Sequence, residues 1–90
     1  MRKVILEFDG TGSIDEIQDL LAEKLELSPY YGRNLDALYD CLTEETSDLC
    51  IGIYGRPEDD RLHYYFGRLL RVFGDAEKEN PHLCVFTERQ

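Results

Sequence analysis

The sequence predicts a two-layer α/β fold in which a three-stranded parallel sheet has helices packed against one face. Short β-rich segments alternate with segments of helical periodicity in the order strand, helix, helix, strand, helix, strand. Helical crossovers between successive strands favour parallel pairing, and each crossover is expected to be right-handed. If the strands lie in sequence order, that handedness puts every crossover helix on the same face.

The N-terminal half is expected to contain one strand and two helices. Residues 3–8, KVILEF, form a β-rich run that ends at a glycine-containing turn cluster. Ser13 then begins a capping-box pattern, and the apolar residues after it recur at helical spacing, so we expect a helix over about residues 14–25. Asn34 is a favourable N-cap for a second helix over about residues 35–43.

The C-terminal half supplies two strands around a longer helix. Residues 49–54, LCIGIY, predict the second strand, and Asp59 and Asp60 open the third helix with negative charge at its positive end. Asn80-Pro81 ends that helix, and residues 82–87, HLCVFT, predict the third strand. No repeat or linker interrupts the pattern, so residues 1–90 are expected to form a single domain.

Composition narrows the classes of function. Nineteen Asp and Glu residues against ten Lys and Arg give a formal net charge of -9, which repels nucleic acid and anionic membranes and attracts basic proteins. The arginines of the third helix are therefore expected to pair with neighbouring carboxylates: Arg61, Arg68 and Arg71. No apolar run approaches the roughly 20 residues of a membrane span, and the N-terminus does not resemble a signal peptide.

The cysteines favour a cytoplasmic location. Cys41, Cys50 and Cys84 are odd in number and include no Cys-x-x-Cys pair and no histidine at metal-ligand spacing. Such a set suits a reducing compartment. We expect three free thiols that fill space in the core.

The second helix has two distinct faces. Leucines at i, i+3 and i+7 predict a buried stripe: Leu35, Leu38 and Leu42. The opposite face carries two carboxylates one turn apart beside an aromatic ring and a hydroxyl: Asp36, Asp40, Tyr39 and Thr43. Glu44 and Glu45 extend the negative field. The pattern is typical either of a solvated acidic face or of an interface anchored by an exposed tyrosine.

The segment from Tyr30 to Thr43, YYGRNLDALYDCLT, closely resembles the signature of the barstar family, the intracellular inhibitors of barnase-type secreted ribonucleases. The other elements have counterparts of similar length, among them Val72-Phe73-Gly74-Asp75-Ala76 before the last strand. The resemblance implies a barstar-like fold and a ribonuclease inhibitor that is a monomer when free. It also implies a one-to-one complex with a basic nuclease, and no cofactor, metal or catalytic residue.

By position, the resemblance also implies the role of each contact residue. Asp40 takes the place of the substrate phosphate and meets the catalytic Arg and His side chains of the nuclease. Asp36 pairs with a further basic residue, and Tyr30 packs on the catalytic His. The other expected contacts frame this centre or lie at its edge: Asn34, Leu35, Tyr39, Thr43, Glu44 and Asp75. A site preorganised with cations for a phosphodiester accepts a fixed carboxylate in its place.

Four positions depart from the type inhibitor of that family. Tyr39 replaces a larger aromatic residue, Arg33 brings positive charge where that inhibitor has an acidic residue, and Glu44-Glu45 replaces Gly-Trp. These departures leave open an immunity or binding module for a different basic toxin or protein partner.

Two other classes are disfavoured. A metal-binding domain is a weaker alternative, because two helical carboxylates supply far fewer than the roughly 6–8 oxygens that Ca²⁺ takes. An enzyme is not expected, because Asp36 and Asp40 lie side by side on one helix instead of facing each other across a cleft. His63 and His82 stand at no ligand spacing and are expected to be ordinary surface or strand-end residues.

Overall fold

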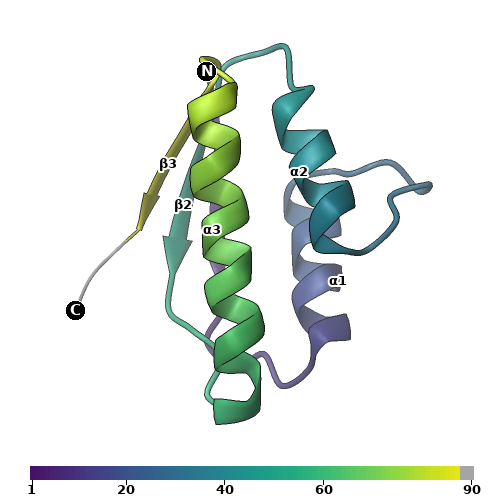
Figure 1. Ribbon diagram of the computed structural model, residues 1–90, viewed down its shortest axis with the longest axis vertical. Helices are drawn as coiled ribbons and strands as arrows, with labels where there is room; N and C mark the ends of the chain where they lie inside the picture. The colour runs from purple at the N-terminus through teal and green to yellow at the C-terminus, as the bar shows by residue number, and fades with distance from the viewer. Residues whose placement is uncertain (88–90) are drawn as a thin grey trace.

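The computed structural model describes residues 1–87 and confirms the two-layer α/β fold (Figure 1). Its elements are β1 (Arg2–Glu7), α1 (Ile14–Lys24), α2 (Leu35–Thr43), β2 (Leu49–Tyr54), the 3-10 turn η1 (Asp60–Leu62), α3 (His63–Glu79) and β3 (Leu83–Thr87). The bounds of α2 and β2 are those expected from the sequence. The third helix differs at its start, because the turn that Asp59 caps is 3-10 before the α-helix begins at His63.

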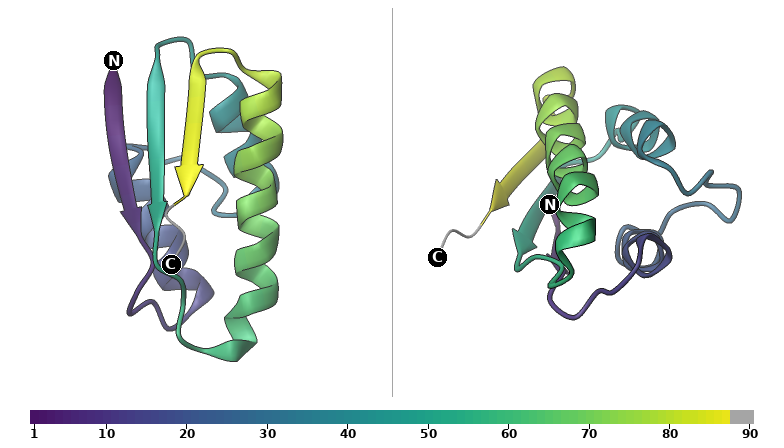
Figure 2. Two further views of the ribbon diagram at one scale, coloured as in Figure 1. Left: turned by 90° about the vertical axis from the view of Figure 1, so that its left-hand side faces the viewer. Right: turned by 60° about the horizontal axis from the view of Figure 1, so that its bottom comes forward.

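The three strands pair in sequence order, and both pairs are parallel. Figure 2 shows the helices gathered on one face of this sheet, with the other face uncovered. Alternate residues of a strand point to opposite faces, so Leu49, Ile51 and Ile53 of β2 lie under the helices and are buried. This arrangement is the one that right-handed crossovers predict.

The core lies between the sheet and the helices. Each helix contributes apolar side chains that are almost completely shielded from solvent: Ile17 and Leu21 from α1, Leu38 and Leu42 from α2, and Leu69, Phe73 and Ala76 from α3. Ile14 is an exception to the expected stripe, because it is the first residue of α1 and remains 46% exposed. Within residues 1–87, no helix is both long enough and apolar enough to span a membrane.

The cysteines are free, as expected, but they do not fill the core. Cys41 and Cys50 are half-buried, and Cys84 is exposed. The physical reason is the strand alternation: Cys50 and Cys84 are register partners on β2 and β3 and point to the uncovered face of the sheet. The expectation that all three thiols are core residues was therefore wrong.

Candidate partner-binding site

The second helix is fixed on the fold by its leucines and its N-cap. Leu35, Leu38 and Leu42 are 8%, 0% and 2% exposed, which confirms the predicted stripe. Asn34 has an extended backbone, and its side-chain oxygen accepts a hydrogen bond from the backbone N–H of Ala37 at 2.7 Å. Burial of one face leaves the opposite face of α2 toward solvent.

Three carboxylates form a line along that opposite face. Asp36, Asp40 and Glu44 are exposed and follow one another at i, i+4 and i+8, and we call them the acidic row. The basic groups of residues 1–87 that form ion pairs do so with other carboxylates, and none lies within 4.0 Å of the acidic row. The negative charge of the row is therefore not neutralised by the described part of the chain.

Two residues of the predicted contact set are less accessible than the sequence suggested. Tyr39 is half-buried and packs against the hydrophobic core. Thr43 is also half-buried, and its hydroxyl donates a hydrogen bond to the backbone carbonyl of Tyr39 at 2.9 Å. The expectation of an exposed tyrosine between two carboxylates was wrong, because the ring packs against the core and is half-buried. The exposed part of α2 is consequently more acidic and less aromatic than predicted.

The carboxylates of the acidic row affect the pKa of the Cys41 thiol. Burial raises the pKa of this thiol, and the carboxylates of Glu44 and Asp40 raise it further. A thiolate is the reactive form of cysteine, so this environment keeps Cys41 protonated and unreactive at neutral pH.

Arg33 lines a hollow together with Asp36 of the acidic row, but its ion pairs are with other carboxylates. Its backbone adopts a left-handed conformation with φ 55°, and its guanidinium Nη2 lies 2.9 Å from Oδ1 of Asp19 and 4.0 Å from Oδ1 of Asp15. Both carboxylates belong to α1. The positive charge that the sequence placed beside the acidic face is thus matched by another helix.

A buried glutamine positions the start of α2. Gln18 of α1 is 1% exposed, and its amide nitrogen donates to the hydroxyl of Tyr65 at 2.7 Å. The hydroxyl of Tyr31 donates to the amide oxygen of Gln18 at 2.7 Å and lies 3.2 Å from the carbonyl oxygen of Asn34. This network was not predicted from the sequence, although Gln18, a polar residue on the apolar face of α1, was a usable signal.

This network predicts a loss of stability at alkaline pH. Burial, followed by the nearby Tyr65 and Cys41, raises the pKa of Tyr31 from 10.0 to about 12. The folded protein therefore holds this proton more tightly than the unfolded chain does, so the stabilisation is complete below pH 10 and is lost as the pH rises through about 12. Urea midpoints measured from neutral pH upward are expected to fall less steeply in Tyr31→Phe. If the urea midpoint falls equally steeply with pH in the variant and in the parent, a group other than Tyr31 causes the loss of stability at alkaline pH.

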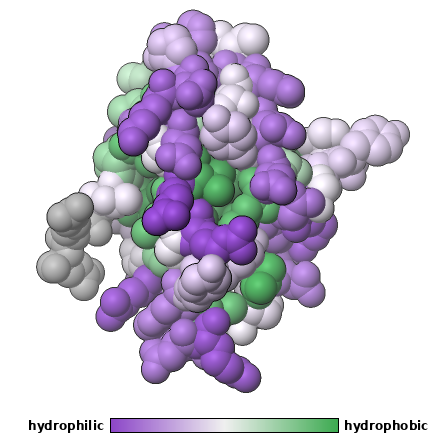
Figure 3. Space-filling model, viewed as in Figure 1, coloured by the Kyte–Doolittle hydropathy of each residue, from purple (hydrophilic) through white to green (hydrophobic). Residues whose placement is uncertain are grey.

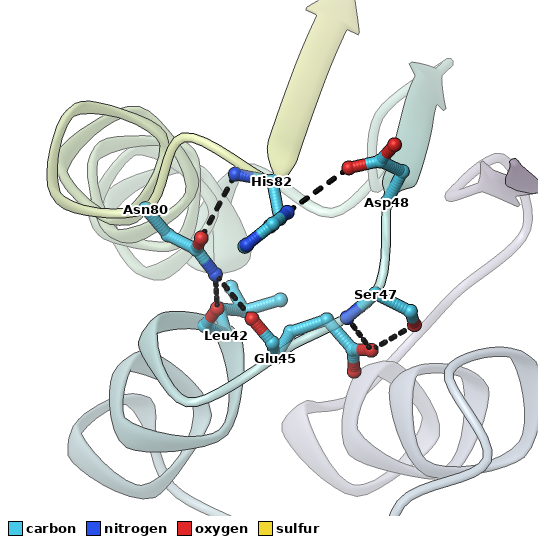
Figure 4. Close-up of polar contacts among 6 residues, drawn as sticks. All are labelled: Leu42, Glu45, Ser47, Asp48, Asn80 and His82. Carbon is cyan, nitrogen blue, oxygen red and sulfur yellow. Dashed lines mark hydrogen bonds and ion pairs between the residues drawn. The ribbon is translucent and has the colours of Figure 1, made fainter.

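The C-terminal end of α2 is hydrogen-bonded to Asn80, the residue that follows α3 (Figure 4). Asn80 is 3% exposed, and its amide nitrogen donates to the carbonyls of Leu42 at 2.9 Å and Glu45 at 3.0 Å. Its side-chain oxygen accepts from the backbone N–H of His82 at 2.9 Å. The sequence identified Asn80 only as the end of α3, so its role at the C-terminus of α2 was missed.

Asn80→Ala is expected to lower the free energy of unfolding by about 1–3 kcal/mol, because it removes a buried donor from two backbone carbonyls at the end of α2, although the carbonyl of Leu42 still accepts from the N–H of Glu45. Ser47→Ala is a matched control from the same cluster, since Ser47 is exposed and, among residues 1–87, hydrogen-bonds only to Glu45. Chemical denaturation of both variants measures the difference. A similar, small effect of the two substitutions would argue against the proposed fixation of α2.

The other predicted contacts lie outside α2. Tyr30 is 93% exposed on the loop between α1 and α2, which projects from the body of the molecule (Figures 1 and 3). Asp75 is exposed on α3, the helix that packs against α2. The structure thus places acidic and aromatic side chains on the loop, on α2 and on the neighbouring helix.

The histidines do not form a metal site. Nε2 of His63 lies 3.2 Å from the carbonyl oxygen of Pro57, and Nδ1 of His82 lies 3.0 Å from Oδ1 of Asp48. Among residues 1–87, no three His, Cys, Asp or Glu side chains are arranged to hold a metal ion.

Sequence comparisons identify the family of the chain. A protein of Bacillus subtilis (strain 168) that carries the provisional name ribonuclease inhibitor YrdF is 51% identical to this chain over 43 residues. That match covers 48% of this chain and 47% of the relative, so the chain spans about half the length of the protein it matches. Residues 1–88 match the family model described as Barstar (barnase inhibitor). Because this model covers nearly all of the sequence, the chain belongs to the barstar family.

Proposed function

We propose that this protein inhibits a basic ribonuclease of the barnase type by placing the acidic row in the active-site cleft of the enzyme. The observation that carries the proposal is the row itself: three exposed carboxylates on a helix whose other face is buried, with no basic partner within residues 1–87. The name of the family and the name of the Bacillus subtilis relative both support an inhibitor of ribonuclease.

In this proposal Asp40, at the centre of the row, occupies the place of the substrate phosphate. A ribonuclease cleft holds cationic side chains in fixed positions for a phosphodiester, so a carboxylate held at the same point makes charge-assisted hydrogen bonds with them. Asp36 and Glu44 extend the contact by one turn in each direction. The hydrogen bonds made by Asn34 and Asn80 hold α2 in place before binding, which reduces the entropy lost on association.

The side chains around the row complete the proposed interface. Tyr30, which is almost fully exposed, is free to pack on an aromatic or imidazole ring of the nuclease. Asn34 and Leu35 border the N-terminal end of the row, Tyr39 and Thr43 border its flank, and Asp75 adds a carboxylate from α3. The half-buried Tyr39 supplies less contact area than a fully exposed ring.

The inhibitor is proposed to act as one domain that is monomeric when free and binds one nuclease molecule. We place its action in the cytoplasm, since its three free thiols suit a reducing compartment. No cofactor or metal takes part in this mechanism, and the protein itself has no catalytic role in it.

Titration of purified barnase-type ribonucleases with this protein tests the proposal. RNA cleavage is expected to fall to zero at one equivalent of inhibitor for at least one nuclease, and the association rate is expected to decrease as salt rises. Glu23→Gln, which removes an exposed carboxylate from α1, is a control that keeps full inhibition. Unchanged cleavage by every nuclease of the panel in the presence of excess inhibitor would refute the proposed function.

A further inference from the structure

The charge of α3 changes sign along its solvent-facing side. Tyr64, Arg68 and Arg71 follow one another at i, i+4 and i+7, all three are exposed, and we call them the basic stripe. Asp75 comes next on the same side, one turn further along the helix. The stripe is thus a local positive region on a protein whose formal net charge is -9.

The arginines of the stripe lack ion-pair partners within residues 1–87. Arg61 is bound by Asp59 at 2.7 Å and Arg33 by Asp19 at 2.9 Å, whereas no carboxylate of this part of the chain lies within 4.0 Å of Arg68 or Arg71. The expectation that all three arginines of the third helix pair with neighbouring carboxylates was therefore right for Arg61 and wrong for the other two within these residues. Two guanidinium groups remain available to a partner.

The stripe adjoins the proposed inhibitory surface. Arg68 lines a hollow of about 310 Å³ together with Leu35 and Asp36 of α2 and Tyr65 of α3. Figure 3 shows hydrophobic side chains at the surface between α2 and α3, bordered by hydrophilic side chains of both helices. The hollow therefore connects Asp36 of the acidic row with Arg68 of the basic stripe.

The surface of the stripe has the composition of an interface. Tyr64 is 77% exposed, and tyrosine and arginine are the side chains that interfaces favour. A Cβ atom added at Gly67 would meet nothing within 4 Å, so no other part of the protein covers α3 at this position. A second hollow of about 440 Å³ lies here and is lined by His63, Tyr64, Gly67, Arg68 and Arg71.

We propose that the basic stripe binds acidic side chains at the rim of the same ribonuclease whose basic cleft receives the acidic row. This inference rests on the proposed function and concerns the choice of partner. Opposite charges on the two proteins attract, whereas a nuclease with basic residues at that rim is repelled by Arg68 and Arg71. The stripe therefore selects, among basic ribonucleases, those that carry acidic residues beside the cleft.

The double variant Arg68→Glu/Arg71→Glu tests this inference against the nuclease that the parent protein inhibits. We expect its association rate to fall by about tenfold, since charges at the rim of an interface act mainly on association. Lys3→Glu, on the uncovered face of the sheet, is the control for charge reversal: it makes half the charge change of the double variant and is expected to leave the rate within about twofold. Thermal melts of each variant verify that the fold is retained.

The outcomes separate this inference from the proposed function. If the double variant associates as fast as the parent, or faster, while Asp40→Ala weakens inhibition, the role of the stripe is overturned and the proposed function stands. If the parent inhibits no nuclease, both are overturned. Binding of an RNA oligonucleotide to the free protein, lost in the double variant, would overturn the assignment of a protein partner to the stripe.

Discussion

Asp40→Ala is expected to weaken binding of the ribonuclease by more than about 2 kcal/mol, or roughly 30-fold in Kd. Asp40 is the middle carboxylate of the acidic row, and its charge is not matched by any basic group of residues 1–87. In the complex this carboxylate would meet several cationic groups at once, and its removal leaves them desolvated and unpaired. Isothermal titration calorimetry against the inhibited nuclease measures the loss.

The same substitution is expected to leave the free protein at least as stable as the parent. Asp36 and Asp40 repel each other at i and i+4, and alanine has a higher helix propensity than aspartate. Glu23→Ala removes one negative charge from an exposed position of α1 and is expected to change binding only slightly. Inhibition by Asp40→Ala that equals that of the parent would place the centre of the interface elsewhere.

Leu38→Ala is expected to lower the free energy of unfolding by about 2–5 kcal/mol. Leu38 is 0% exposed and lies in the middle of the stripe that attaches α2 to the core. The substitution removes buried apolar surface and leaves a cavity that the neighbouring side chains fill only in part. Urea denaturation monitored by circular dichroism measures the change in the free energy of unfolding. The substitution is expected to lower the urea midpoint with little change in the slope of the free energy against urea concentration.

Ile14→Ala provides the comparison for Leu38→Ala. Ile14 is also a helical aliphatic residue, but it is 46% exposed, so its truncation is expected to cost well under about 1 kcal/mol. Equal destabilisation by the two substitutions would mean that the leucine stripe does not anchor α2.

The elements of the fold could be predicted because their signals are local. The bounds of α2 follow from the N-cap Asn34 and from leucines at helical spacing, and those of β2 follow from an apolar run that ends at glycine. The exposed position of Asp36 and Asp40 follows from the same periodicity. These features need no knowledge of any distant part of the chain.

The features that could not be predicted depend on contacts between distant segments. Asn80 reaches the end of α2 across 38 residues, and Gln18 reaches Tyr65 across 47 residues. The orientation of Tyr39 depends on the core beneath it, and the open positions of Arg68 and Arg71 depend on which carboxylates the fold brings near them. The separation of two residues in the sequence does not show how close the fold brings their side chains.

The hydrogen bonds of Asn80 determine when, during translation, α2 can be fixed in its final position. The carbonyls of Leu42 and Glu45 are made early, but their donor is synthesised 38 and 35 residues later. A nascent chain still attached to the ribosome within that interval carries the three carboxylates of the acidic row on a helix whose C-terminal end has not yet received the hydrogen bonds of Asn80. On the proposed function, α2 is therefore fully fixed for binding only after Asn80 has been synthesised.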